Sequence, residues 1–305
     1  MYSFPIIRKK FVMKKGLKIT LIVLGAIAGV VSLDIGVSLI VNAATRVETS
    51  HELNGKTFNK IDINIGTADV YLKKYSGTAP YVKCIETSYA KHEVAVEDNT
   101  LKIDCNVKER YTFLMISPQR KIELYVPTTT EYKFNIHRTT GDVFIDSDFN
   151  FSEFIAKGST GDISTSTNVV SGKLDIDQST GDVKLFNVKA SSINIETSTG
   201  NTNLDMVKCI GELKIKSSTG EHYLNYCDAD KINIETSTGD VDLKSCDANS
   251  INIKTSTGDV TADFRSSKIV YAESSTGKKD VPKSTSGGLC SIETSTGDIK
   301  VTFSK

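Results

Sequence analysis

The acids that directly follow a repeated glycine are the most chemically suggestive feature of the sequence. They are Asp142, Asp162, Asp182, Asp240, Asp259 and Asp298. If the repeats stack, these carboxylates form a column at a spacing of about 5 Å, and Ca²⁺ takes several such oxygen ligands. The column is interrupted by Asn201, Glu221 and Lys278, and the Gly-rich nonapeptide of calcium-binding β-rolls is missing. We therefore expect these acids to cap turns by accepting backbone N–H groups, with calcium binding as the alternative.

Other reactive side chains are scarce. The chain has 4 His, 6 Cys and no Trp, and the histidines are scattered at positions 51, 92, 137 and 222. No Ser/His/Asp or His/carboxylate constellation follows from their spacing, and the absence of Cys-x-x-Cys disfavours a redox or zinc site. We expect no catalytic residue, no cofactor and no metal.

The cysteines divide into two groups by their spacing. Cys84 and Cys105 fall on separate predicted strands and are the better candidates for a disulfide. Cys227 and Cys246 are one repeat apart, which predicts a buried column of thiols rather than a bond between them.

The elements that position these residues come from an internal repeat. Ser-Thr-Gly, or Thr-Thr-Gly in the first copy, recurs every 19 or 20 residues. Its glycines are Gly141, Gly161, Gly181, Gly200, Gly220, Gly239, Gly258, Gly277 and Gly297. A glycine fits a corner where the backbone needs a positive φ, so we interpret all of them as structural turn residues.

Around each glycine, apolar and polar residues alternate with period two. In one unit Ile232 and Ile234 precede Gly239, and Val241 and Leu243 follow it. This pattern predicts short strands with one buried face, which bury that face only by stacking coil on coil. We therefore expect an all-β fold, a single-chain parallel β-solenoid (β-helix) with 19–20-residue coils. By the same parity, both threonines of each Thr-Ser-Thr run, such as Thr197 and Thr199, should point inward, which argues against an ice-binding face.

The N-terminus differs from this body. The six cations of residues 1–18 precede residues 19–41, an apolar run whose only charge is Asp34. About 20 apolar residues span a bilayer, and flanking cations stay in the cytoplasm. We expect an uncleaved signal anchor with the C-terminal part extracytoplasmic; cleavage near Ala43 is the alternative. Because Lys+Arg and Asp+Glu are both 37, the remainder carries six net negative charges, which disfavours nucleic acid as a partner.

The chain thus divides into five predicted segments. They are a basic cytoplasmic segment (1–18), a transmembrane helix (19–41), a linker (42–55), irregular N-terminal coils forming a cap (56–130) and the regular solenoid (131–305). With the strand end Leu124-Tyr125-Val126-Pro127 and the Thr-Gly-Asp-Val repeats, this arrangement resembles the bacterial putative-adhesin family, a domain of unknown function that includes LiaG-like cell-envelope proteins.

The resemblance covers roughly residues 56–303 and implies a β-solenoid protein of the cell envelope, without catalytic residues to carry over. We expect a membrane-anchored, non-enzymatic protein that binds or scaffolds at the envelope, as an adhesin or an envelope-stress accessory. Its expected partners are the membrane and an unidentified envelope protein or cell-wall polymer. A passive spacer is the first alternative, and a polysaccharide-active β-helix enzyme is the second.

Overall fold

The structure is a computed structural model of the chain, and it describes residues 47–77, 79–86, 90–107 and 120–304. These residues form 25 β-strands and no helix. Among them no helix is long and apolar enough to cross a membrane, and the predicted transmembrane segment 19–41 lies outside the described residues.

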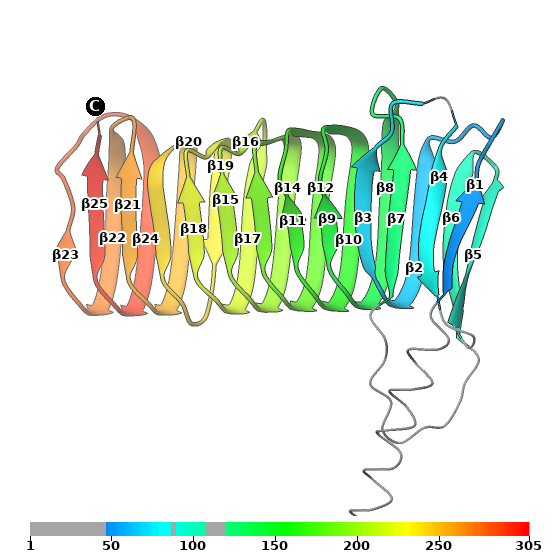
Figure 1. Cartoon of the computed structure of the whole chain (residues 1–305). Helices are drawn as coiled ribbons and strands as arrows, with labels where there is room; N and C mark the ends of the chain where they lie inside the picture. The colour runs from blue at the N-terminus through cyan, green and yellow to red at the C-terminus, as the bar shows by residue number, and fades with distance from the viewer. Residues whose placement is uncertain (1–46, 78, 87–89, 108–119, 305) are drawn as a thin grey trace, which may run out of the picture. The chain divides into compact units, whose positions relative to one another are not determined.

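The strands build two facing parallel sheets, since each coil contributes one strand to each sheet (Figure 1). Sheet B contains, in spatial order, β6 (Thr100–Val107), β2 (Lys60–Thr67), β8 (Glu131–Thr140), β10 (Phe149–Thr160), β12 (Val169–Thr180), β14 (Val188–Thr199), β16 (Lys208–Cys209) with β17 (Glu212–Thr219), β19 (Asp228–Glu235), the second half of β20 (Val241–Thr257), β24 (Gly288–Thr296) and β22 (Lys268–Thr276). Sheet A contains β7 (Lys121–Val126), β3 (Asp69–Lys74), β9 (Val143–Ile145), β11 (Ile163–Thr165), β13 (Val183–Phe186), β15 (Thr202–Asp205), β18 (His222–Asn225), the first half of β20, β21 (Val260–Phe264), β25 (Ile299–Phe303) and β23 (Lys279–Asp280).

Three antiparallel strands cover the N-terminal end of this solenoid. β1 (Val47–Glu52) pairs with β4 (Tyr81–Glu86), and β4 pairs with β7 at the end of sheet A. β5 (Ala90–Glu97) pairs with β6 at the end of sheet B. Antiparallel hairpin strands break the stacking pattern, so they terminate the parallel ladder at this end.

The aliphatic columns inferred from the repeat are present in register. Leu174, Ile193, Leu213, Ile232 and Ile251 follow one another as Cα partners and are all nearly inaccessible to solvent. Burying one such side chain in each coil contributes about 1.5–3 kcal/mol before entropy is counted. The prediction of an all-β parallel solenoid is confirmed.

The coils do not stack in the order of the sequence at either end. The coil of β24 and β25 lies between that of β20–β21 and that of β22–β23, so Ile251 pairs with Cys290 and Cys290 pairs with Val270. At the other end the coil of β2 and β3 lies between β6–β7 and β8–β9. Figure 1 shows β23 outside β25. Consequently Phe303, near the end of the chain, packs against the core beside Phe264 and does not form the outermost coil.

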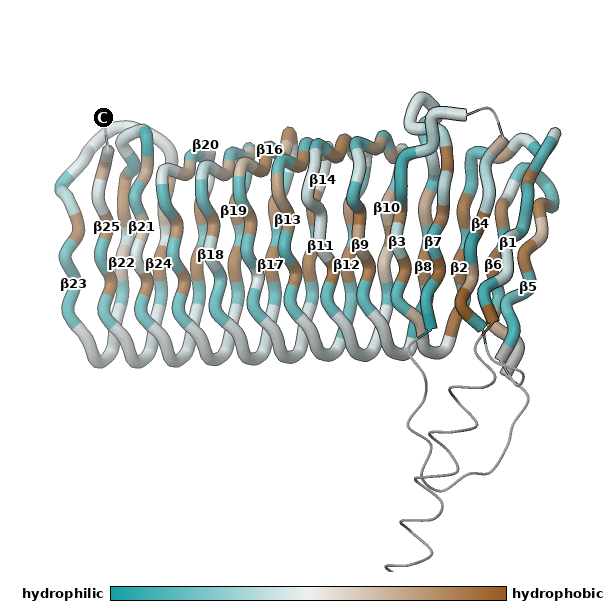
Figure 2. Tube along the Cα trace, in the orientation of Figure 1, coloured by the Kyte–Doolittle hydropathy of each residue, from teal (hydrophilic) through white to brown (hydrophobic). Residues whose placement is uncertain are grey.

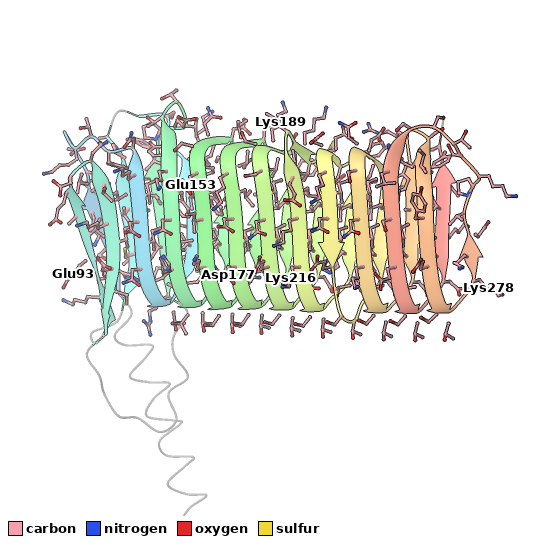
Figure 3. The ribbon with its side chains drawn as sticks, turned by 180° about the vertical axis from the view of Figure 1, so that it is seen from behind. Glu93, Glu153, Asp177, Lys189, Lys216 and Lys278 are labelled. Carbon is pink, nitrogen blue, oxygen red and sulfur yellow. The ribbon has the colours of Figure 1, made fainter. Side chains whose placement is uncertain are left out.

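The Ser-Thr-Gly corners line one long edge of the solenoid. Figure 2 shows this lower edge as a band of neutral hydropathy, and Figure 3 shows its short side chains as an evenly spaced row. In each Thr-Ser-Thr run the first threonine is buried, as Thr197 is, whereas the second, such as Thr199, is exposed. The prediction that both point inward is wrong for the second threonine, because the chain turns the corner there and strand parity ends.

Candidate binding surface

The repeated glycines hold the backbone at the edge where the two sheets meet. Their φ angles lie between 131° and 157°. A Cβ on Gly181 would lie 2.1 Å from the carbonyl oxygen of Gly161, and one on Gly161 would lie 2.1 Å from that of Gly141. The coils therefore touch backbone to backbone at this edge, which leaves no room for a side chain.

The acids that follow these glycines form a hydrogen-bond ladder between coils. Asp142 Oδ1 accepts the N–H of Asp162 at 2.8 Å, and Asp162 Oδ1 accepts that of Asp182 at 2.8 Å. Asp182 accepts the N–H of Asn201, and Asn201 in turn accepts that of Glu221, both at 2.9 Å. The ladder thus continues through a neutral amide, so it needs an acceptor oxygen and no negative charge.

The remaining acids of the set make the same contact farther along the solenoid. Asp240 accepts the N–H of Asp259, and Asp259 accepts that of Asp298 at 2.7 Å. Asp298 then accepts the N–H of Lys278 on the outermost coil. For Asp182, burial opposes ionisation, but the Asn201 N–H and the Lys184 ammonium outweigh it and lower its pKa. Each of these carboxylates is directed at a backbone donor of the neighbouring coil.

The cysteines are all free thiols. Cys84 lies on β4 in sheet A and Cys105 on β6 in sheet B, and the structure does not contain the predicted disulfide between them. The predicted thiol column is present: Cys227 and Cys246 are both buried, and each donates a weak hydrogen bond to a backbone carbonyl. These two thiols are part of the core.

One histidine replaces an aliphatic residue in the interior. His222 lies in register between Thr202 and Val241 and is fully buried. Its Nε2 is 2.8 Å from the hydroxyl of Ser217, while its Nδ1 has no hydrogen-bond partner among the described residues. Burial lowers the pKa of His222 to about 4, so the ring is neutral at pH 7.

Aromatic side chains gather on the outer face of sheet A near its N-terminal end, where the sequence did not indicate them. Tyr71 stacks on Phe144 with ring centroids 4.6 Å apart, and Tyr81 stacks on Tyr125 at 4.5 Å. The Lys121 ammonium lies 4.1 Å from the Tyr71 ring centroid. These ring faces are therefore occupied by one another and by a cation, which favours sheet stabilisation over sugar stacking.

An exposed apolar surface interrupts the regular pattern on the central coils. Six of the nine exposed large apolar side chains of the described residues fall between positions 170 and 226. They are Val170, Phe186, Met206, Ile210, Tyr223 and Tyr226. Ile210 is 81% exposed, more than any of the others. Val170, Met206, Ile210 and Tyr226 line two adjoining hollows that share Lys189 and Lys208, and we call these six residues the central surface. Phe186 and Tyr223 border a separate hollow over sheet A.

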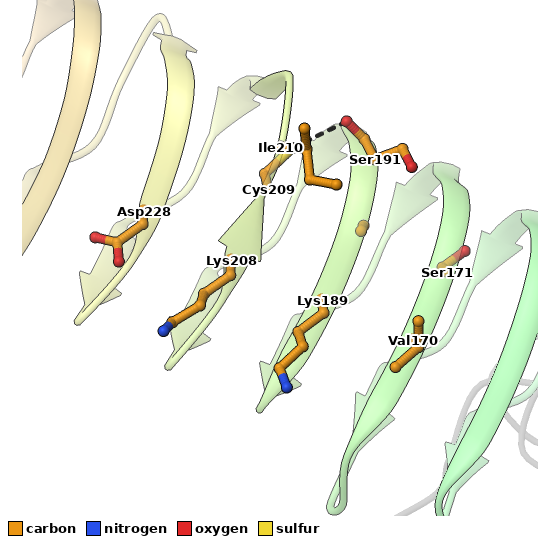
Figure 4. Close-up of a pocket in the computed structure, with 9 residues that line it drawn as sticks. Val170, Ser171, Lys189, Ser191, Lys208, Cys209, Ile210 and Asp228 are labelled. Carbon is orange, nitrogen blue, oxygen red and sulfur yellow. Dashed lines mark hydrogen bonds between the residues drawn. The ribbon is translucent and has the colours of Figure 1, made fainter.

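A cavity of about 290 Å³ lies within the central surface (Figure 4). Val170, Ala190, Cys209 and Ile210 give it an apolar lining. The coil that contains Ile210 and Gly211 has one residue more than the coil before it, and the register shifts between Cys209 and Leu213. The N–H groups of Ile210 and Gly211 donate to the carbonyls of Ala190 and Ser191. The backbone bulges there and turns Ile210 outward.

Two lysines form the polar border of this cavity. Lys189 and Lys208 are direct register partners on β14 and β16, so their side chains leave the sheet about 5 Å apart. Neither lysine makes an ion pair with another described residue. Like charges directly opposite each other destabilise a sheet. On its other side Lys208 has Asp228 as its register partner, and Asp228 lines the same cavity and accepts a hydrogen bond from Arg265.

The corner beside the cavity displays large side chains on a strained backbone. Met206 and Tyr226 have φ angles of 55° and 51°, at positions equivalent to Asn187. Both residues line a second hollow next to the cavity. Lys189 and Lys208 border both the hollow and the cavity. A bulky residue in this conformation costs about 1–3 kcal/mol, and such outliers are typical of functional positions.

Comparison with known proteins places this architecture in a family. The sequence profile described as Toastrack DUF4097 matches residues 58–302. The chain belongs to the Toastrack DUF4097 family. A comparison with curated protein sequences gives no match.

Several solved structures are similar to this Toastrack protein, and one of them reaches a TM-score above 0.5. A protein from Parabacteroides distasonis named a "putative adhesin" is similar over 83% of this chain and 97% of its own, with 12% identity and a TM-score of 0.51. A "putative adhesin" from Bacteroides fragilis is similar over 84% of this chain and 97% of its own, with 19% identity and a TM-score of 0.49. A "putative lipid binding protein" from Parabacteroides distasonis matches 85% of this chain and 97% of its own at 15% identity and a TM-score of 0.46.

Proposed function

We propose that this Toastrack protein is a membrane-anchored, extracytoplasmic and non-catalytic protein that binds a protein partner at the bacterial cell envelope. The apolar run at 19–41 and the cations before it support the anchor and its orientation. The names of the similar proteins fit an adhesin-like role. The repeated carboxylates, which bond to backbone, support a structural rather than a catalytic use.

The central surface is the observation that carries this proposal. A passive spacer needs a polar exterior, whereas this surface exposes Ile210, Met206 and Tyr226 beside two lysines that form no ion pair with any residue that the structure describes. Exposed Tyr and Met around an apolar cavity are typical of protein interfaces. A fully polar cell-wall polymer would leave that cavity without an apolar occupant, so a protein partner with an apolar anchor and an acidic side chain fits better.

Capture by the full-length chain tests this function. Purified protein in detergent is immobilised, then exposed to solubilised membranes and, separately, to purified cell wall. We expect one membrane protein to be retained by the wild type and lost with Ile210→Ser. Tyr271→Ser is the matched control, because Tyr271 is also exposed but lies on the outermost coil.

Each outcome bears on the proposal. Retention from the cell-wall fraction alone would replace the protein partner with a polymer. Equal capture by the wild type and by Ile210→Ser, or no capture from either fraction, would overturn the central surface as the binding site and favour the spacer. Deleting the C-terminal coil would not test a binding site at the end of the solenoid, because the coil of β24 and β25 lies between two other coils.

A further inference from the structure

Polar side chains that can bind a metal gather at the N-terminal end of the solenoid. His51 comes from β1, Cys84 and Glu86 from β4, and His92 from β5. The antiparallel pairing of β1 with β4 brings His51 close to Cys84 and Glu86, although His51 is far from them in the sequence. His51 and His92, which are distant in the sequence, thus both lie near Glu86.

These side chains are buried and incompletely bonded. Cys84, His92 and Glu86 are 0%, 4% and 5% exposed. Three buried imidazole nitrogens have no hydrogen-bond partner among the described residues. They are both ring nitrogens of His92 and the Nε2 of His51. A buried imidazole nitrogen without a partner is costly, so three in one cluster indicate that something else occupies their lone pairs or N–H groups.

The distances suit a small ion. One ligand atom from each of His51, Cys84 and Glu86 lies within 4.8 Å of the others. His92 Nδ1 is 3.4 Å from a carboxylate oxygen of Glu86. Ligands of a tetrahedral zinc ion, at bond lengths of about 2.0–2.3 Å, lie about 3.3–3.8 Å from one another. His51, Cys84 and Glu86 are therefore close to such an arrangement, whereas His92 contacts the cluster through Glu86 and must move toward the ion to bind it.

We propose that His51, Cys84, Glu86 and His92 form a structural Zn²⁺ site at the N-terminal end of the solenoid. A thiol, two imidazoles and a carboxylate are ligand types that zinc prefers. Binding replaces the S–H bond of Cys84 with a Zn–S bond and releases one proton. The thiolate and the Glu86 carboxylate then balance the charge of the ion. The site links β1, β4 and β5, which would otherwise be held mainly by strand pairing.

Metal content and cobalt spectroscopy of the full-length protein test the site. We expect one equivalent of zinc after dialysis, and a thermal unfolding temperature that rises with zinc. Co²⁺ in place of zinc should give a thiolate-to-cobalt charge-transfer band. Cys84→Ser should abolish that band, and His92→Gln should weaken zinc binding at least tenfold. Cys290→Ser is the matched control, since Cys290 is an equally buried thiol at the other end of the solenoid.

Circular dichroism verifies that each variant retains its strand content. If Cys84→Ser unfolds, the zinc affinity of His92→Gln still tests the site. Zinc bound equally by wild type, Cys84→Ser and His92→Gln would overturn the proposal, as would a wild type that retains no zinc. A Cys84–Cys105 disulfide in the native protein, detected by mass spectrometry without reductant, would also overturn it, because one sulfur cannot serve both purposes.

Discussion

The glycine edge gives the most direct prediction about stability. We expect Gly181→Ala to destabilise the solenoid strongly, because two costs add. Gly181 has a φ of 136°, and an L-residue held there costs about 1–3 kcal/mol. Its Cβ would also lie 2.1 Å from the Gly161 oxygen and 2.6 Å from the carbonyl carbon, both backbone atoms of the neighbouring coil. Such overpacking typically costs about 1–3 kcal/mol.

The expected loss is therefore about 2–6 kcal/mol, a large part of the roughly 5–15 kcal/mol that stabilises a typical domain. Urea unfolding followed by circular dichroism measures it. Gly66→Ala is the matched control, because no atom lies within 4 Å of the added Cβ and the backbone there is not in the positive-φ region. A loss for Gly181→Ala below about 1 kcal/mol, or no larger than that of Gly66→Ala, would refute the argument that coil contact excludes a side chain.

Two further predictions concern polar groups of the solenoid. His222 has a pKa of about 4 when folded and about 6.5 when unfolded, so the unfolded chain binds more protons between these pH values and stability falls as the pH drops through them. This difference in pKa lowers the free energy of unfolding by about 3 kcal/mol between pH 7 and pH 4. Urea unfolding should detect this loss in the wild type but not in His222→Val. An equal loss in both proteins would show that another group titrates. Carboxylates with a lowered folded pKa, such as Glu123 at about 2, begin to lose their contribution as the pH falls below the ordinary value of 4.5, and the wild type and His222→Val share that loss. Asp182→Asn should change the free energy of unfolding by less than about 0.5 kcal/mol, because Asn201 already serves as an acceptor in the ladder. Asp182→Ala removes the acceptor and should cost about 1–2 kcal/mol. Equal effects of the two substitutions in unfolding experiments would contradict the ladder.

The sequence predicted the regular part of the fold because one physical constraint repeats there. Alternation around each glycine determines which residues face inward, so the register of Leu174, Ile193 and Leu213 follows from the period alone. The order of the end coils could not be predicted in this way. Every coil offers a similar parallel ladder, so the period does not distinguish Cys290 from Val270 as the partner of Ile251.

The candidate sites were less predictable because they lie where the repeat fails. Ile210 is exposed by a bulge of one extra residue, which the sequence shows only as a 20-residue spacing. The proximity of His51 to Cys84 depends on the antiparallel pairing of β1 with β4, which are distant in the sequence, and no local pattern encodes that pairing. The second threonine of each Thr-Ser-Thr run lies beyond the end of strand alternation. In each case tertiary geometry overrides the local period.

Photocrosslinking in living cells tests most directly whether the central surface binds a protein partner at the cell envelope. A photoreactive amino acid is placed at position 210 of the full-length protein in one strain and at position 271 in another, since both side chains are exposed. We predict a discrete crosslinked protein adduct from position 210 and none from position 271. No adduct from position 210, or the same adducts from both positions, would contradict the claim.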